Sequence, residues 1–96
     1  MSPIIRIKLN KLRKRLDSLD NKLLNIIKKR SKLVNEVLKV KIYKKEIIDK
    51  TRISYILKKI KKKSIKTKID PKITNRIWKN MIWSFIDYEK RNFKKK

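Results

Sequence analysis

One arginine interrupts a long row of apolar residues and is the first candidate for chemistry in this sequence. Arg30 occupies a position where residues at alternating steps of three and four are otherwise Leu, Ile or Val. Such steps are typical of the buried face, or seam, of a helix that packs on other helices. A buried guanidinium needs compensation, so Arg30 either reaches water or a carboxylate along the seam, or projects into a polar cavity and binds an anion. The seam comprises Leu9, Leu12, Leu16, Leu19, Leu23, Ile26, Arg30, Leu33, Val37 and Val40.

Two further cations have spacings that could let them act with Arg30. Lys41 follows Arg30 by eleven residues, which leaves the two side chains about 20° apart around one helix. Arg13 precedes Arg30 by seventeen residues and projects about 100° away from that face, towards another helix or a partner chain. The simpler interpretation of Arg13 is an ion pair with Asp17, four residues later on the same helix.

Charged groups further along the chain complete the candidate set. Glu89 follows Ile82 by seven residues and Phe85 by four, which places it inside the apolar arc of a helix. A carboxyl in such a setting either stays protonated or pairs with a cation, here one from the first helix. Asp49 is a suitable N-cap for a second helix, and Arg52 on its first turn is by default a solvated charge.

These side chains need helices to position them, and the apolar pattern predicts three. They run from about 7 to 43, from about 50 to 63 and from about 71 to 92. A lysine-rich connector at 61–68 precedes the third helix, which Asp70 caps and Pro71 begins, and the basic tail 90–96 should fray. We expect a single all-α domain, 1–96. Because two short helices cannot cover the seam of so long a first helix, the pattern also predicts an intertwined homodimer.

The composition removes several classes of function. The 96 residues include no Cys, His or Gly, which excludes disulfides, imidazole chemistry, the usual zinc sites and Gly-rich phosphate loops. We therefore expect no metal and no cofactor. No apolar run approaches the roughly 20 residues of a membrane span, and the N-terminal residues do not resemble a secretory signal. These features predict a cytoplasmic protein that does not enter a membrane.

The net charge of +24 points first to a polyanion such as nucleic acid. The lysines, however, are spread through every segment rather than gathered on one face. Trp78 and Trp83, the candidate stacking contacts, lie on or beside the apolar arc of the third helix, where core packing accounts for them. The sequence therefore favours a protein that binds a small anion over a basic nucleic-acid-binding protein. The positive electrostatic field of the chain attracts any small anion.

Residues 12–41 resemble the first helix of a known enzyme family. The segment LRKRLDSLDNKLLNIIKKRSKLVNEVLKVK meets every fixed position of the pattern L-R-x-x-[IL]-D-x-[IL]-D-x-x-[IL]-[IL]-x-[IL]-[IL]-x-x-R-x-x-[LV], and a Lys follows eleven residues after the second Arg. This pattern is that of the all-helical (AroQ-class) chorismate mutases, and looser similarity continues through DKTR to the last helix. The resemblance implies three helices per chain and an entangled homodimer with two shared sites. It also implies the isomerisation of chorismate to prephenate, in the shikimate pathway to Phe and Tyr.

The resemblance implies roles for the matched residues. Arg30 would bind a substrate carboxylate, and Arg13 would reach over from the partner chain to do likewise, because a guanidinium can grip a carboxylate with two hydrogen bonds. Lys41 would donate to the ether oxygen of the substrate as its bond to carbon breaks. Asp49 and Arg52 match an acidic residue and an Arg of the family's second helix. No metal and no covalent intermediate is implied.

Three positions depart from the family pattern. Ile53 stands where a Glu that holds the substrate hydroxyl commonly follows the second-helix Arg, and Phe85 replaces a frequent Ser near a carboxylate. Glu89 replaces a Gln that donates to the ether oxygen in many members. Since a Glu donates only when protonated, activity should rise as pH falls.

Two of these departures open alternatives within the same fold. The isochorismate–pyruvate lyases of salicylate synthesis are similar in the first helix and also carry an apolar residue after the helix-2 Arg, as Ile53 follows Arg52 here. Their Lys-to-Arg spacing resembles that of Lys41 to Arg52. A third interpretation is a degenerate member that keeps the dimer without the chemistry.

Overall fold

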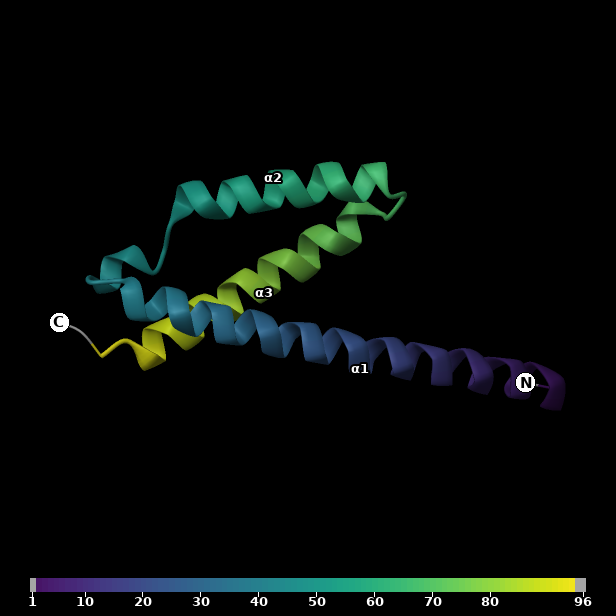
Figure 1. Cartoon of the computed structure of the whole chain (residues 1–96). Coiled ribbons are helices and arrows are strands. Elements are labelled where there is room, and N and C mark those ends of the chain that lie inside the picture. The colour runs from purple at the N-terminus through teal and green to yellow at the C-terminus, as the bar shows by residue number, and fades with distance from the viewer. Residues whose placement is uncertain (1, 95–96) are drawn as a thin grey trace. The chain divides into compact units, whose positions relative to one another are not determined.

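The computed structural model describes residues 2–94 and consists of helices joined by short turns (Figure 1). The helices are α1 (Pro3–Val40), the short 3₁₀ helix η1 (Lys44–Glu46), α2 (Lys50–Lys66) and α3 (Pro71–Asn92). No strand occurs between residues 2 and 94, so the predicted all-α class with a very long first helix is confirmed. Within that range, none of the helices is both long and apolar enough to cross a bilayer.

The contacts divide the chain into two compact units, residues 1–33 and 34–96, and each is described by itself. The first unit carries the N-terminal part of α1, which begins at Pro3 rather than near residue 7. Ser2 caps it, since its Oγ accepts a hydrogen bond from the backbone N of Ile5 at 3.2 Å. The apolar seam of this unit is open to solvent, because each of these residues exposes more than half of its surface: Leu12, Leu16, Leu19, Leu23, Ile26 and Leu33.

The C-terminal end of α1 lies at Val40, before the expected boundary at 43. The backbone N of Lys41 donates to the carbonyl of Leu38 at 3.3 Å, which tightens the last turn. The backbone N of Tyr43 instead donates to Glu46 Oε1 at 2.9 Å, at the start of η1. Tyr43 therefore belongs to the next turn, and Lys41 lies just beyond the helix.

The hydrophobic core lies in the second unit and is small. One residue before α2 and two residues of α3 are buried, and partly buried side chains from the end of α1, from α2 and from the residue after α3 pack on them. The helices α2 and α3 also pack against each other along the hairpin that joins them (Figure 1). The buried residues are Ile47, Ile82 and Ile86, and those packed on them are Leu38, Ile48, Ile53, Ile56, Leu57 and Phe93.

The structure corrects the prediction of a lysine-rich connector at 61–68, because α2 continues to Lys66. A Schellman motif ends it: Ile69 N donates to the carbonyl of Ser64 at 2.8 Å and Lys68 N to that of Ile65 at 3.2 Å. Lys68 takes the left-handed conformation, with φ of 62°. That conformation is usual at this position for glycine, a residue the chain does not contain, and it costs other residues on the order of 1 kcal/mol.

A buried hydrogen bond stabilises the same hairpin from inside. The hydroxyls of Ser64 and Thr74 lie 2.7 Å apart, and both residues are buried. Each hydroxyl also has a carbonyl acceptor within its own helix, that of Ile60 at 2.7 Å for Ser64 and that of Pro71 at 3.4 Å for Thr74, so either hydroxyl can be the donor between the two. The pair joins the end of α2 to the first turns of α3 and satisfies two polar groups that would otherwise be costly to bury.

The start of α3 follows the Asp–Pro signal. Asp70 Oδ1 accepts a hydrogen bond from the backbone N of Lys72 at 2.9 Å, and Pro71 is the first helical residue. The helix continues to Asn92, so residues 90–92 of the expected frayed tail are helical, and Arg91 Nε pairs with Asp87 Oδ2 at 2.9 Å. Residues 95 and 96 of that tail lie outside the described residues.

Candidate active site

The two candidate residues that the structure brings together are Lys41 and Glu89. The Lys41 ammonium lies 3.0 Å from Glu89 Oε1 and 3.3 Å from Oε2, so it donates to both carboxylate oxygens. The side chains are only 18% and 7% exposed. This is the ion pair with a cation from the region of the first helix that the sequence offered as one interpretation of Glu89.

The position of Glu89 follows from the buried face of α3. Ile82, Ile86 and Glu89 are spaced by four and three residues and are all buried, so the carboxyl continues the apolar stripe that forms the core. A carboxylate in such a stripe needs a compensating charge, because burial without one costs several kcal/mol. Lys41 supplies that charge from the segment that follows α1.

A second polar link joins α1 and α3 beside this pair, and the sequence analysis missed it. The Tyr88 hydroxyl donates to Asn35 Oδ1 at 2.7 Å, and the contact is partly buried. The Arg91 guanidinium lies 5.9 Å from the centroid of the Tyr88 ring. The only sequence signal was a polar residue, Asn35, next to the apolar seam, and such residues are usually solvated.

Asp49 and Arg52 take the roles that the sequence gave as their defaults. Asp49 caps α2, since its Oδ1 accepts a hydrogen bond from the backbone N of Arg52 at 2.9 Å. The side chain of Arg52 is exposed, and its guanidinium lies 5.4 Å from the centroid of the Tyr55 ring, one turn further along α2. A cation–π contact of this kind contributes on the order of 0.5–1 kcal/mol at an exposed site.

Arg13 and Arg30 belong to the first unit, whereas the other candidate residues belong to the second. Arg13 is exposed, and Arg30 is partly buried on α1. That either guanidinium approaches the Lys41–Glu89 pair stays a prediction from the sequence.

Comparison with known proteins supplies the family. The family model for chorismate mutase type II matches residues 12–90, which is most of the chain. The chain belongs to the type II chorismate mutase family. The searches of curated proteins and of solved structures returned no match to it. The matched range includes every candidate residue named above, and membership makes this chain one of a family of enzymes that isomerise a small molecule.

Ile53 and Phe85, the two apolar residues at positions where the resemblance led us to expect polar ones, both lie in the second unit. Ile53 packs against the core of Ile82 and Ile86. It also lines an apolar pocket of about 350 Å³ beside Trp83. Phe85 is partly buried on α3, one turn before Glu89. Neither side chain can accept a hydrogen bond from a substrate hydroxyl, so any such contact in this chain must come from another group.

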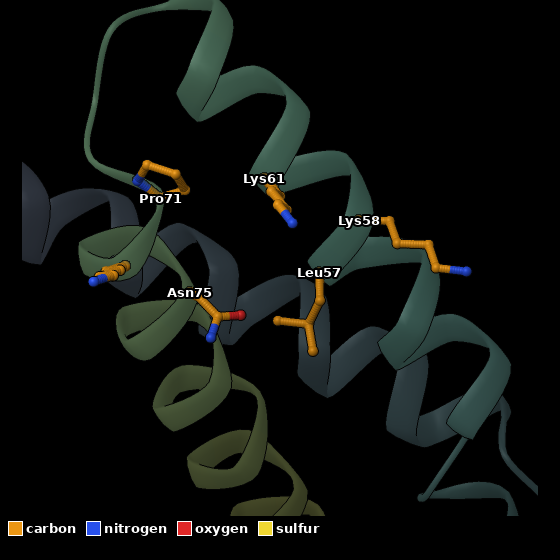
Figure 2. Close-up of a pocket in the computed structure, with 6 residues that line it drawn as sticks. Leu57, Lys58, Lys61, Pro71 and Asn75 are labelled. Carbon is orange, nitrogen blue, oxygen red and sulfur yellow. The ribbon is translucent and has the colours of Figure 1, made fainter.

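Another pocket lies between α2 and the start of α3 and contains none of the candidate residues. Its volume is about 380 Å³. In Figure 2, Lys61 and Asn75 point into the space between the two helices, whereas Lys58 points away from it. The lysines are exposed, so each contributes little fixed charge to the pocket. The lining residues are Leu57, Lys58, Lys61, Pro71, Lys72 and Asn75.

The geometry of the Lys41–Glu89 pair limits the chemistry that the pair can perform. In the structure the carboxylate accepts two hydrogen bonds from one ammonium group. Lys41 retains its positive charge and a third N–H for another acceptor, whereas an ionised Glu89 can only accept. The pair can therefore place one donor near an oxygen atom of a substrate, and a protonated Glu89 would add a second.

Proposed function

We propose that this chain is a chorismate mutase that converts chorismate into prephenate. The observation that supports this most directly is the nearly buried Lys41–Glu89 pair within a chain that matches the family from residue 12 to residue 90. A lysine ammonium held in a poorly solvated position is the donor that a breaking C–O bond of an ether needs, because negative charge develops on its oxygen.

In the proposed reaction one C–O bond breaks and one C–C bond forms within the same molecule. No electrons are exchanged with a second reactant, so the protein has to hold a compact conformer and stabilise the developing charge. Lys41 donates to the ether oxygen, and a protonated Glu89 donates to the same oxygen. Arg30, and Arg13 of a second copy of the chain, bind the two carboxylates, while Asp49 and Arg52 border the site on α2.

The active unit in this proposal is a homodimer. The apolar seam residues from Leu12 to Leu33 are exposed in the single chain, and a helix in a protein gains most of its stability by packing such an apolar face. Covering a Leu side chain contributes about 1.5–3 kcal/mol, so a second copy that packs on this seam would stabilise both chains. The family resemblance implies the same entangled pair.

A second candidate function is an isochorismate–pyruvate lyase. The observation that favours it is Ile53, which packs in the hydrophobic core at the position where many mutases carry a Glu that contacts the substrate hydroxyl. Both functions use the same cations on a dianion, and they differ in which isomer of the substrate is accepted.

The experiment that tests the proposal is incubation of the purified protein with chorismate, and separately with isochorismate, at pH 5 and pH 8 in moderate salt. Prephenate and pyruvate are quantified by chromatography. Prephenate from chorismate supports the mutase, pyruvate from isochorismate alone supports the lyase, and no turnover of either substrate contradicts both.

A matched pair of variants shows whether the activity comes from the proposed site. Lys41→Met should abolish turnover, because it removes the donor. Lys32→Met makes the same change on an exposed position of α1 away from the seam, and it should leave the rate unchanged. Equal rates in the two variants would contradict the role of Lys41.

A further inference from the structure

Two polar links of different character join α3 to the C-terminal part of α1 in the second unit. One is the ion pair between Lys41 and Glu89, with separations of 3.0 and 3.3 Å. The other is the hydrogen bond from the Tyr88 hydroxyl to Asn35 Oδ1, at 2.7 Å. Tyr88 and Glu89 are consecutive on α3, so a contact that fixes the position of Tyr88 also limits where the Glu89 carboxyl can lie.

The ion pair by itself does not determine how the two helices are placed. A lysine ammonium is a compact charge on a flexible stem of four carbons, and a glutamate carboxyl also has several rotatable bonds. Lys41 and Glu89 could therefore stay in contact while α3 slides or rotates by a small amount. The apolar packing of Leu38 on Ile82 and Ile86 is not directional either.

The hydrogen bond between Asn35 and Tyr88 depends more strongly on distance and direction than the ion pair does. Each side chain has only two rotatable torsions, and a sideways shift of α3 by about 1.5 Å, the rise of one residue, would lengthen the 2.7 Å contact to about 3.1 Å and bend it away from linearity, which weakens it. On the α3 side, the Arg91 guanidinium lies 5.9 Å from the centroid of the tyrosine ring and pairs with Asp87 at 2.9 Å, but this pair is exposed and contributes little.

We propose that Asn35 and Tyr88 are a positioning pair that sets the register of α3 against the end of α1, so that the Glu89 carboxyl meets Lys41 in one geometry. Neither residue touches the reacting atoms in this proposal. The catalytic consequence rests on the proposed function, since only a mutase or lyase site needs the two groups at a defined separation from one oxygen atom.

The first test needs no substrate and measures the interaction energy between Lys41 and Glu89. The coupling energy between Lys41 and Glu89 is obtained from a double-mutant cycle with Lys41→Met and Glu89→Gln, by urea denaturation at one fixed protein concentration. The cycle is then repeated in a Tyr88→Phe background, and again in an Asn35→Leu background in case one of these variants does not fold.

If the positioning pair acts as proposed, the coupling energy falls by about half or more in either background. The matched control is Tyr43→Phe, which removes a hydroxyl from an exposed ring two residues after Lys41, and it should leave the coupling energy unchanged. An unchanged coupling energy in the Tyr88→Phe background, with only a lower overall stability, would overturn the proposal.

The second test uses activity on chorismate. Tyr88→Phe should lower kcat by about tenfold, because small misplacements of a catalytic group are costly, while KM stays nearly the same. The double variant Asn35→Leu/Tyr88→Phe should be no slower than the single one, since both changes break one hydrogen bond. A normal kcat in Tyr88→Phe would overturn the catalytic part of the proposal. If the unmodified protein has no turnover, the proposed function fails, and the coupling energies still decide whether Asn35 and Tyr88 set the register.

Discussion

The carboxylate of Glu89 accepts hydrogen bonds at both of its oxygens from a single ammonium group, that of Lys41, at 3.0 and 3.3 Å. The same arrangement has opposite consequences for stability and for the proposed reaction. Ionised Glu89 compensates the charge of Lys41 within a poorly solvated part of the fold, but an ionised carboxylate cannot donate to a substrate oxygen. In the proposed reaction, Glu89 would therefore have to lose its charge, and with it the stabilising ion pair, before it could donate to a substrate oxygen.

The rate of the proposed mutase should rise as pH falls from 8 to 5. The sign follows from the chemistry of Glu89, because only its protonated form donates a hydrogen bond, and the protonated fraction grows with acidity. Replacement by an amide, Glu89→Gln, should remove this dependence and keep the rate at pH 8 at least as high, since the amide always donates. Initial rates from pH 5 to 8 for both proteins check this, and a flat profile in the unmodified protein would count against the role of Glu89.

Removing only one partner of the pair should destabilise the fold. Lys41→Met leaves the 7% exposed carboxylate of Glu89 without its compensating charge, and we expect a loss of about 2–3 kcal/mol in the free energy of unfolding at pH 7. The double variant Lys41→Met/Glu89→Gln should recover most of that loss, because no charge remains buried. Urea denaturation measures both, and a double variant as unstable as the single one would show that the charge is not the cause.

Arg30 should matter for turnover far more than for folding. Arg30→Leu restores the apolar seam, so the variant should fold, keep its oligomeric state and be at least as stable as the unmodified protein. It should also lose nearly all activity on chorismate, since a substrate carboxylate then has no guanidinium to bind. Activity that persists within a few-fold of the original would exclude Arg30 from the site.

A charge in the middle of the seam should separate the proposed dimer. Leu19→Glu places a carboxylate on a residue that is exposed in the single chain, but that would be buried between two copies. Sedimentation or light scattering should then report a monomer. Asn21→Glu makes the same change in charge away from the seam and should remain a dimer. A monomeric unmodified protein would contradict the homodimer outright.

Sites shared between chains predict complementation. Arg13→Ala and Lys41→Ala should each be inactive alone. After unfolding and refolding as an equal mixture, half of the dimers combine both chains, and each of these has one intact site out of two. About one quarter of the unmodified activity should therefore return. A mixture that stays inactive, although mixed dimers are present, would show that Arg13 does not act across the interface.

The amino-acid sequence by itself determined the helical class, the long seam and the positions that do not fit an apolar face. These are local or periodic properties: Asp70 and Pro71 start α3 through their own cap and backbone torsion, and Asp49 caps α2 in the same way. The match of residues 12–41 to the family pattern, and its looser continuation to the last helix, are also properties of residue types and spacing, and the family model confirms them over residues 12–90.

Element ends were less accessible to sequence reasoning. The early end of α1 depends on the hydrogen bond from Tyr43 N to Glu46. The extension of α2 to Lys66 depends on a left-handed Lys68 and on the hydroxyl pair of Ser64 and Thr74. A run of lysines resembles a solvated connector because it carries no apolar periodicity, although lysine itself is a good helix former.

Only the tertiary structure decided which polar groups meet. Lys41 and Glu89 are 48 residues apart in the chain, and Asn35 and Tyr88 are 53 apart. Periodicity marked Glu89 as a carboxyl on an apolar face, but it could not choose its partner among 32 lysines and arginines. That choice depends on how α3 lies against the end of α1. Packing on the core of Ile47, Ile82 and Ile86 brings the end of α1 and α3 together, and the hydrogen bond of Tyr88 to Asn35 joins the same two helices.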